Sequence, residues 1–261
     1  MLVSFAPPLG RLMARIFEGE RTFLTPILGW LERLTYRIGV DEKEEMPWKS
    51  YAMSLLWFNL FGFIAVFLIQ ALQSILPLNP QNVSNVSWHS AFNTAVSFMT
   101  NTNWQGYAGE TTMSYFTQMM ALTVQNFVSA ATGIAVLLGL IRGISRRSGK
   151  TIGNFWVDLT RSTVYVLLPL SILLSIALVS QGVVQNFNSY SEAATLEGAK
   201  QTLPMGPAAS QIAIKQLGTN GGGFFNANSA HPFENPTPLS NFLQMLAILL
   251  LPAALVFTFG H

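Results

Sequence analysis

Four long apolar stretches constrain the fold of this chain more than any other feature. They span residues 51–76, 115–140, 162–183 and 242–259, and none contains Asp, Glu, Lys or Arg. An α-helix of about 20 apolar residues is long enough to cross the roughly 30 Å hydrocarbon core of a bilayer. We therefore predict four membrane-spanning helices, with Pro169 tolerated as a kink in the third.

Composition supports the membrane assignment and excludes several other classes. Hydrophobic residues make up 50% and charged residues 10% of the 261 residues, whereas a soluble domain carries about 25% charged residues. The net charge is +2, and the basic residues lie in short segments between the apolar stretches. This distribution indicates membrane topology and not a nucleic-acid partner. There is no cysteine, and the three histidines (His89, His231 and His261) lack metal-ligand spacing. We expect no transition-metal site and no organic cofactor.

Two further apolar segments, 88–99 and 207–217, are too short to span a bilayer. Polar runs follow them at 100–106 and 217–229. Irregular backbone at membrane depth is tolerated only where it is buried in protein or lines a watery cavity. The pattern predicts two re-entrant half-helices, each leading into a pore or a binding site.

The second polar run contains three consecutive glycines, Gly221 to Gly223. Without Cβ atoms, such a backbone can turn its carbonyl oxygens toward a common axis, and rings of carbonyls replace the hydration shell of an alkali cation. An ordinary loop is the alternative, because Gly and Asn are common turn residues. The run alone leaves both interpretations open.

An internal repeat favours the ion-binding interpretation. Each half of the chain has the same order: spanning helix, charge-poor loop, half-helix, polar run, spanning helix. The run Thr100-Asn101-Thr102-Asn103 also resembles Gly218-Thr219-Asn220-Gly221. Weak internal symmetry of this kind is typical of channels and transporters.

The predicted fold is an all-α polytopic membrane protein with two helix–pore-loop–helix repeats of the potassium-channel-like type. It has four spanning helices and two re-entrant half-helices. The expected divisions are a cytoplasmic or interfacial N-terminal segment with a truncated start at 1–49, a first repeat at 50–141, a basic cytoplasmic loop at 142–161 and a second repeat at 162–261.

The basic loop fixes the predicted orientation. It holds five basic residues against the single acid Asp158, and by the positive-inside rule it is cytoplasmic, which places both polar runs on the outer face. Gly149-Lys150-Thr151 resembles the end of a Walker loop. The first glycine of that motif is missing, since Ile144 stands there, and no strand precedes it, so we predict no nucleotide site.

Several groups have more than one interpretation. Residues 23–38 form either an interfacial amphipathic helix or a solvated linker. Glu110 is expected to be a solvated loop residue. Lys215 either snorkels or pairs with Glu234. Polar residues at helical spacing in the second spanning helix either bond to neighbouring helices or contact an ion; they are Gln125, Asn126, Ser129 and Thr132.

The chemistry of the polar runs indicates a weakly hydrated monovalent cation. Amide and backbone dipoles present their negative ends, no Lys or Arg lies between Leu76 and Leu140, and Glu110 is the only acid near the first run. A divalent cation is expected to recruit carboxylates. A carbonyl ring needs roughly fourfold surrounding, so two repeats supply half of it. The other half must come from more chain, a second copy or a partner subunit.

Six segments carry a resemblance to a known family. They are NTAVSF at 93–98, TNTNWQ at 100–105, LTVQNF at 122–127, LPMGP at 203–207, LGTNGGGFFNANS at 217–229 and HPFENP at 231–236. In these segments the chain resembles the KdpA family, the potassium-binding subunits of Kdp potassium-transporting ATPases. Family members carry four such repeats and an additional N-terminal membrane helix, so the chain is similar to the N-terminal half of such a protein.

The resemblance implies a non-catalytic subunit in the bacterial cytoplasmic (inner) membrane. Such a subunit selects K⁺ from the outer side and passes it through an intramembrane tunnel to a P-type ATPase subunit, and two small accessory subunits complete the complex. The K⁺-binding residues implied are Asn101, Thr102, Asn103, Gln105, Thr219, Asn220, Gly221 and Gly222. A passive two-repeat cation channel acting as a homodimer is the alternative, and a structural membrane subunit without an ion site is a third possibility.

Overall fold

The computed structural model describes residues 1–146 and 149–260, and it is mostly helical. Arg147 and Ser148 of the predicted basic loop, together with His261, lie outside the described residues. The α-helices are α1 (Leu2–Phe17), α2 (Thr25–Tyr36), α3 (Trp48–Ala71), α4 (Trp88–Met99), α5 (Gly109–Thr112), α6 (Val124–Ser145), α7 (Phe155–Arg161), α8 (Leu168–Ser180), α9 (Ala208–Leu217) and α10 (Pro238–Phe259). Short 3₁₀-helices lie at η1 (Gln73–Ile75) and η4 (Asn228–Ala230), and π-helices at η2 (Thr117–Thr123) and η3 (Ser162–Leu167).

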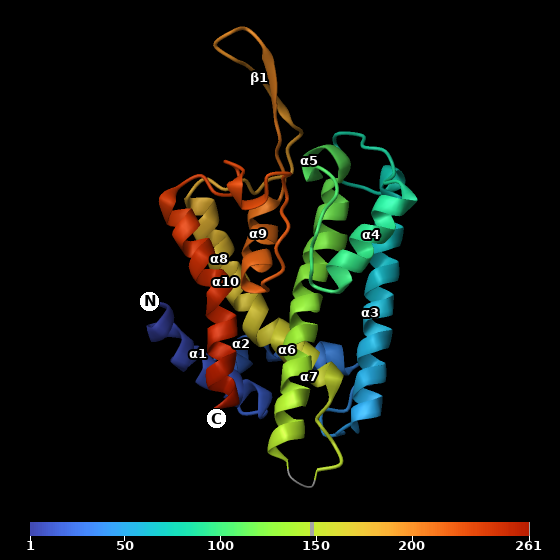
Figure 1. Cartoon of the computed structure of the whole chain (residues 1–261), viewed down its shortest axis with the longest axis vertical. Coiled ribbons are helices and arrows are strands. Elements are labelled where there is room, and N and C mark those ends of the chain that lie inside the picture. The colour runs from blue at the N-terminus through green and yellow to red at the C-terminus, as the bar shows by residue number, and fades with distance from the viewer. Residues whose placement is uncertain (147–148, 261) are drawn as a thin grey trace.

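Four helical stretches in the described part of the chain are long and apolar enough to cross a membrane, as predicted. They are Trp48–Ala71, Thr117–Ser145, Phe155–Ser180 and Pro238–Phe259, with a mean hydropathy between 1.9 and 2.3. The π-turns η2 and η3 keep the second and third of these continuous. The four helices run along the long axis of the molecule (Figure 1).

The third spanning helix begins at Phe155, seven residues before the predicted start at Ser162. Asn154 starts it, because its side-chain oxygen accepts hydrogen bonds from the backbone N–H groups of Trp156 and Val157. The prediction placed this turn in a loop because it contains Asp158 and Arg161. Both charges are neutralised by partners from other helices, which lets the helix include them.

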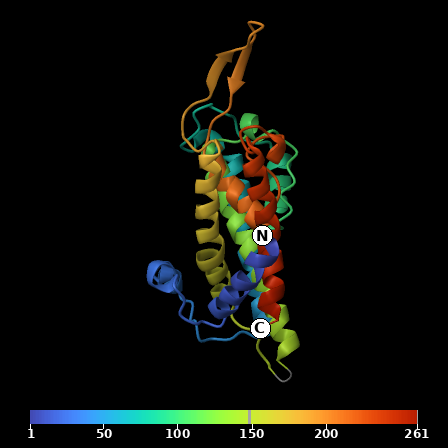
Figure 2. The same cartoon turned by 90° about the vertical axis from the view of Figure 1, so that its left-hand side faces the viewer.

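The half-helices α4 and α9 lie in the same half of the molecule, and α1 and α2 lie toward the other end (Figures 1 and 2). Helix α1 packs closely along α10: a Cβ added at Gly10 would lie 2.5 Å from the carbonyl oxygen of Ala254. The Thr258 hydroxyl donates to the Gly10 carbonyl at 3.1 Å. Residues 1–17 therefore form a helix held against the last spanning helix.

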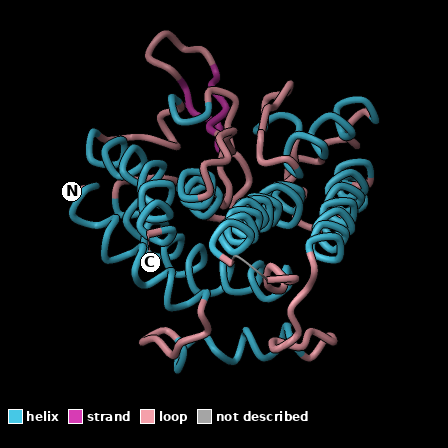
Figure 3. The backbone as a smooth tube through the Cα atoms, turned by 60° about the horizontal axis from the view of Figure 1, so that its bottom comes forward, coloured by secondary structure: helices cyan, strands magenta, loops and turns pink. Residues whose placement is uncertain are grey.

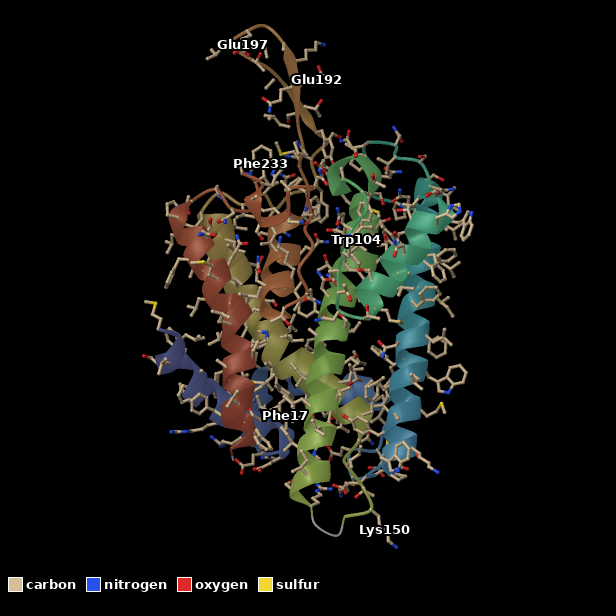
Figure 4. All side chains as sticks on the ribbon, viewed as in Figure 1. Phe17, Trp104, Lys150, Glu192, Glu197 and Phe233 are labelled. Atoms are coloured by element: carbon tan, nitrogen blue, oxygen red, sulfur yellow. The ribbon has the colours of Figure 1, made fainter. Side chains whose placement is uncertain are left out.

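A two-stranded antiparallel hairpin projects beyond the helices (Figure 3), formed by β1 (Ser191–Ala194) and β2 (Lys200–Leu203). The sequence of this segment is mostly polar. Four-residue strands without apolar alternation give no pattern to detect. Figure 4 shows Glu192 and Glu197 on this hairpin at one end of the molecule and Lys150 at the opposite end.

The end of the molecule opposite the hairpin is held by a buried ion pair. Asp158 of α7 accepts hydrogen bonds from Arg142 of α6 at 2.6 and 2.9 Å, and the Tyr51 hydroxyl of α3 lies 2.9 Å from the same carboxylate. The Asp158 side chain is 2% exposed. Three spanning helices thus meet at one carboxylate.

Replacing Asp158 with Asn is expected to destabilise the protein by about 3 kcal/mol, because it leaves the Arg142 charge without its buried partner. Thermal unfolding of the purified protein measures this loss. The control is Glu45→Gln, which breaks the exposed pair with Arg146 and is expected to cost less than about 1 kcal/mol. Equal effects of the two substitutions would contradict the role given to Asp158.

Residues 23–38 contain helix α2, so the helix alternative is confirmed over Thr25–Tyr36. Its anchor is Glu32, which accepts hydrogen bonds from the Tyr165 hydroxyl at 2.6 Å and Arg161 Nε at 3.0 Å. Burial raises the pKa of Glu32, but the hydrogen bonds from Tyr165, Arg161 and Tyr36 outweigh it and bring the pKa below its ordinary 4.5. The carboxylate is therefore charged at neutral pH and holds α2 against the third spanning helix.

Candidate ion-binding site

The two predicted polar runs leave their half-helices by the same hydrogen-bonded turn. After α4, the backbone N–H groups of Thr100, Asn101 and Thr102 donate to Val96, Phe98 and Ser97. After α9, those of Gly218, Thr219 and Asn220 donate to Ile214, Gln216 and Lys215. The two sets correspond position by position.

Backbone dihedral angles also correspond. Asn101 and Asn103 have φ values of 61° and 53°, and the matching Thr219 and Gly221 have 53° and 77°. This left-handed region is tolerated by Gly and Asn, and it is unusual for a β-branched residue such as Thr219. Such backbone persists only where the surroundings hold it, and it clusters at functional sites.

Side chains of the two runs bond to each other and to α6. Ser129 donates to the side-chain oxygen of Asn101 at 2.8 Å, and Asn101 Nδ2 donates to the Gly218 carbonyl at 3.2 Å. Asn220 Nδ2 contacts Asn101 Oδ1, the Asn126 carbonyl and Ser129 Oγ. The structure therefore brings Asn101 and Asn220 together, although they are far apart in the sequence.

Gln105 bridges the outer parts of the runs. Its side-chain oxygen accepts from the Gly223 N–H at 2.8 Å, and its Nε2 donates to the Gly223 carbonyl at 3.1 Å. The side-chain amide of Gln105 thus makes the two hydrogen bonds to Gly223 that a paired β-strand residue would make through its backbone. It links the two runs.

The carbonyl oxygens at the centre of each run have no hydrogen-bond donor among the residues that the structure describes. These are the carbonyls of Asn101, Thr102, Asn103, Thr219, Asn220 and Gly221. The Gly222 carbonyl differs, since Lys215 Nζ donates to it at 3.1 Å. Of the predicted residues, six therefore present unpaired backbone oxygens, while Gln105 and Gly222 are already engaged in contacts within the chain.

A cavity of about 400 Å³ opens between the outer parts of the two runs. Residues of both runs line it, including Thr102, Asn103 and Gly222, together with the exposed side chain of Trp104, which Figure 4 labels. A Cβ added at Gly221 would meet nothing within 4 Å. A second cavity of about 130 Å³ touches Asn101, Gly218 and Thr219 and is otherwise lined mostly by apolar side chains. Space thus lies on two sides of the unpaired carbonyls.

Three of the four predicted polar residues of the second spanning helix hydrogen-bond within the protein: Asn126, Ser129 and Thr132. Asn126 Oδ1 accepts from Asn103 Nδ2 at 2.5 Å, and Thr132 donates to the Val128 carbonyl at 2.7 Å. Gln125 faces Gly62 of α3, where an added Cβ would lie 2.8 Å from its side-chain oxygen. Bonding to neighbouring segments therefore holds for Asn126 and Ser129, whereas Thr132 bonds within its own helix and Gln125 Nε2 is buried without a partner among the described residues.

Two charged residues near the second run also have defined partners. Glu110 is partly exposed, and its carboxylate accepts from the Asn226 N–H at 2.8 Å. Lys215 pairs with Glu234, which is one of the two predicted alternatives. The contact of Glu110 with Asn226 was not predicted, because these two residues are far apart in the sequence.

No group of three or more His, Asp or Glu side chains in the described part of the chain could hold a metal ion together. The donors that the site offers are neutral carbonyl oxygens, which suit a monovalent cation better than a divalent or a transition-metal ion.

The family model described as "Potassium-transporting ATPase A subunit", KdpA, matches residues 1–261. The chain belongs to the KdpA family. Curated KdpA relatives carry the description "Potassium-transporting ATPase potassium-binding subunit". The relative from Pseudomonas syringae pv. tomato is 63% identical over 262 residues, which cover 100% of this chain and 46% of the relative. The relative from Herpetosiphon aurantiacus is 62% identical over 270 residues, again 46% of its length.

A third relative gives the same result. The KdpA relative from Sorangium cellulosum is 60% identical over 271 residues, covering 100% of this chain and 47% of the relative. The chain thus spans about half the length of the curated KdpA relatives it matches. The membership confirms the resemblance drawn from the sequence segments.

Proposed function

We propose that the chain supplies half of a K⁺-selective filter in the potassium-binding subunit of an ATP-driven potassium uptake complex. It captures K⁺ from the outer side and passes it to a P-type ATPase subunit, and it has no catalytic role itself. The observation that carries this proposal is the set of six unpaired backbone carbonyls on two matching turns. Carbonyl oxygens in such an array replace the water ligands of a weakly hydrated cation.

The chain is proposed to consist of two helix–pore-loop–helix repeats. The first comprises 50–141 and the second 162–261, after an N-terminal segment at 1–49 and separated by a basic loop at 142–161. The matching hydrogen bonds after α4 and α9 support this division, as does the packing of both half-helices against α6. Each repeat then supplies one quarter of a ring, and the remaining half comes from more chain, a second copy or a partner.

The proposed ligands are the backbone oxygens of Asn101, Thr102, Asn103, Thr219, Asn220 and Gly221. Gln105 and Gly222, also predicted as ligands, are proposed to shape the ring, since their polar atoms already have partners. Neutral dipoles around an ion favour K⁺ over divalent cations, which need carboxylates.

The proposed location is the bacterial cytoplasmic (inner) membrane, in a multi-pass arrangement with the hairpin outside and the basic loop inside. Separation of Glu192 and Glu197 from Lys150 at opposite ends supports this orientation (Figure 4). The proposed partners are the ATPase subunit, small accessory subunits and the surrounding lipid.

Uptake into proteoliposomes separates this proposal from a passive homodimeric channel. With the assembled complex, K⁺ uptake is expected to require ATP and to stop when the ATPase subunit is left out. Because the chain has no native cysteine, a single cysteine at Asn226 beside the outer cavity also reports symmetric dimers by cross-linking. Efficient cross-linked dimers that conduct K⁺ without ATP would favour the passive channel instead.

A further inference from the structure

The most buried ion pair of the described residues lies directly behind the second polar run. The side chains of Lys215 and Glu234 are 1% and 0% exposed, and Lys215 Nζ contacts a carboxylate oxygen of Glu234. Taking two charges out of water is costly, and the cost is recovered only where further hydrogen bonds satisfy both groups. Stability alone gives little reason for such a pair, because apolar residues of similar volume often serve equally well.

The remaining contacts of the pair all go to the backbone of the second run. Lys215 Nζ donates to the Gly222 carbonyl at 3.1 Å. The other oxygen of Glu234 accepts from the N–H groups of Phe224 and Phe225 at 2.7 and 2.9 Å. The pair therefore holds a carbonyl and two amides of the run at once.

The first run has no such charge. Ser97 occupies the position that matches Lys215, since the Ser97 carbonyl accepts from Thr102 N as the Lys215 carbonyl accepts from Asn220 N. The Ser97 hydroxyl is buried without a partner, and the first run is held by neutral amides such as Asn126. A fixed charge pair is thus a feature of one run and not a general requirement of the turn.

We propose that Lys215 and Glu234 are positioning residues that set the ion selectivity of the second run. Lys215 holds the Gly222 carbonyl away from the ring, so that the series of ligands in this run ends at Gly221. Glu234 balances the lysine charge and fixes the amides that follow. This inference rests on the proposed K⁺ filter and names the residues that tune it.

The physical reason lies in the number and field strength of the ligands. If Lys215 is lost, the Gly222 carbonyl is free to join the ring and the Glu234 carboxylate remains buried without a counter-charge. Both changes strengthen the negative field at the ion, and a stronger field favours a smaller cation such as Na⁺ over K⁺.

The test uses Lys215→Met in the assembled complex, with apparent KM values for K⁺, Rb⁺ and Na⁺ measured from cation-stimulated ATP hydrolysis. The preference for K⁺ over Na⁺ is expected to fall by about tenfold or more, because the field at the site changes by a charge and a dipole. The double variant Lys215→Met/Glu234→Gln removes both charges and keeps an oxygen for Phe224 and Phe225. It is expected to recover part of the lost preference.

The matched control is the exposed pair Lys200 and Glu192 on the hairpin. Lys200→Met and Glu192→Gln are expected to leave all three KM values unchanged. If Lys215→Met and the double variant keep the wild-type preference and only their yield or melting temperature falls, the pair is structural and the inference is wrong. If Lys215→Met does not assemble, the double variant is the test, because it buries no unpaired charge. The inference then requires that the K⁺ preference of the double variant is lower than that of the wild type.

The outcome is separable from that of the proposed filter. A wild-type K⁺ preference in Lys215→Met, together with its loss in Gly221→Asp, overturns this inference and leaves the filter intact. A wild-type preference in both variants overturns the filter assignment as well.

Discussion

Gly221→Asp in the assembled transporter is expected to lose both high-affinity K⁺ binding and discrimination against Na⁺ and Rb⁺. Gly221 has a φ of 77°, and nothing lies within 4 Å of a Cβ added there. An L-residue here costs about 1–2 kcal/mol in backbone strain. Its carboxylate would also stand among the carbonyls that replace the hydration shell of the ion.

The apparent KM for K⁺ is expected to rise by about a hundredfold, equivalent to roughly 2.7 kcal/mol of lost binding. Cation-stimulated ATP hydrolysis measures the KM for K⁺, and the same assay with Na⁺ and Rb⁺ measures the discrimination. Gly198→Asp is the matched control, because Gly198 has a φ of 81° and nothing within 4 Å of an added Cβ, but lies on the hairpin. Similar losses of K⁺ affinity in both variants would show that backbone strain, and not contact with the ion, causes the higher KM.

Asn220→Asp is expected to disrupt the hydrogen bonds that link the two runs to each other and to α6. Asn220 is 3% exposed, and its Nδ2 donates toward Asn101 Oδ1, the Asn126 carbonyl and Ser129 Oγ. A carboxylate has no hydrogen to offer and would face two oxygens that can only accept. A buried polar group without its partner costs about 1–3 kcal/mol, and more when charged.

The expected result is a lower melting temperature together with at least a tenfold weaker response to K⁺, since 1.4 kcal/mol corresponds to a factor of 10. Asn188→Asp on the exposed segment before the hairpin is the control and is expected to change neither quantity. Wild-type K⁺ response in Asn220→Asp would mean that the two runs do not need this contact to form the site.

The spanning helices and half-helices were predictable because long charge-free stretches leave the chain few options in a bilayer. The half-helix predicted at 88–99 has these limits in the structure, Trp88–Met99, because one polar segment ends before Trp88 and the next begins after Met99. Non-helical backbone follows both half-helices, as the polar runs at 100–106 and 217–229 indicate, and their role in ion binding stays a prediction.

What sequence reasoning missed depends on partners distant in the chain. Asp158 and Arg161 read as loop residues until Arg142 and Glu32 are placed beside them. Gln105 looked like an ion ligand, and only the position of Gly223 shows that its amide pairs with backbone. The strands β1 and β2 are too short and too polar to produce a periodic signal.

The most direct test of the account is anomalous diffraction from crystals of the complete potassium-binding subunit soaked in Tl⁺, a heavy substitute for K⁺. We expect an anomalous peak coordinated by backbone oxygens from both runs, among them those of Thr102 and Gly221, and the loss of that peak in Gly221→Asp. A Tl⁺ peak bound elsewhere, with none between the two runs, would contradict it.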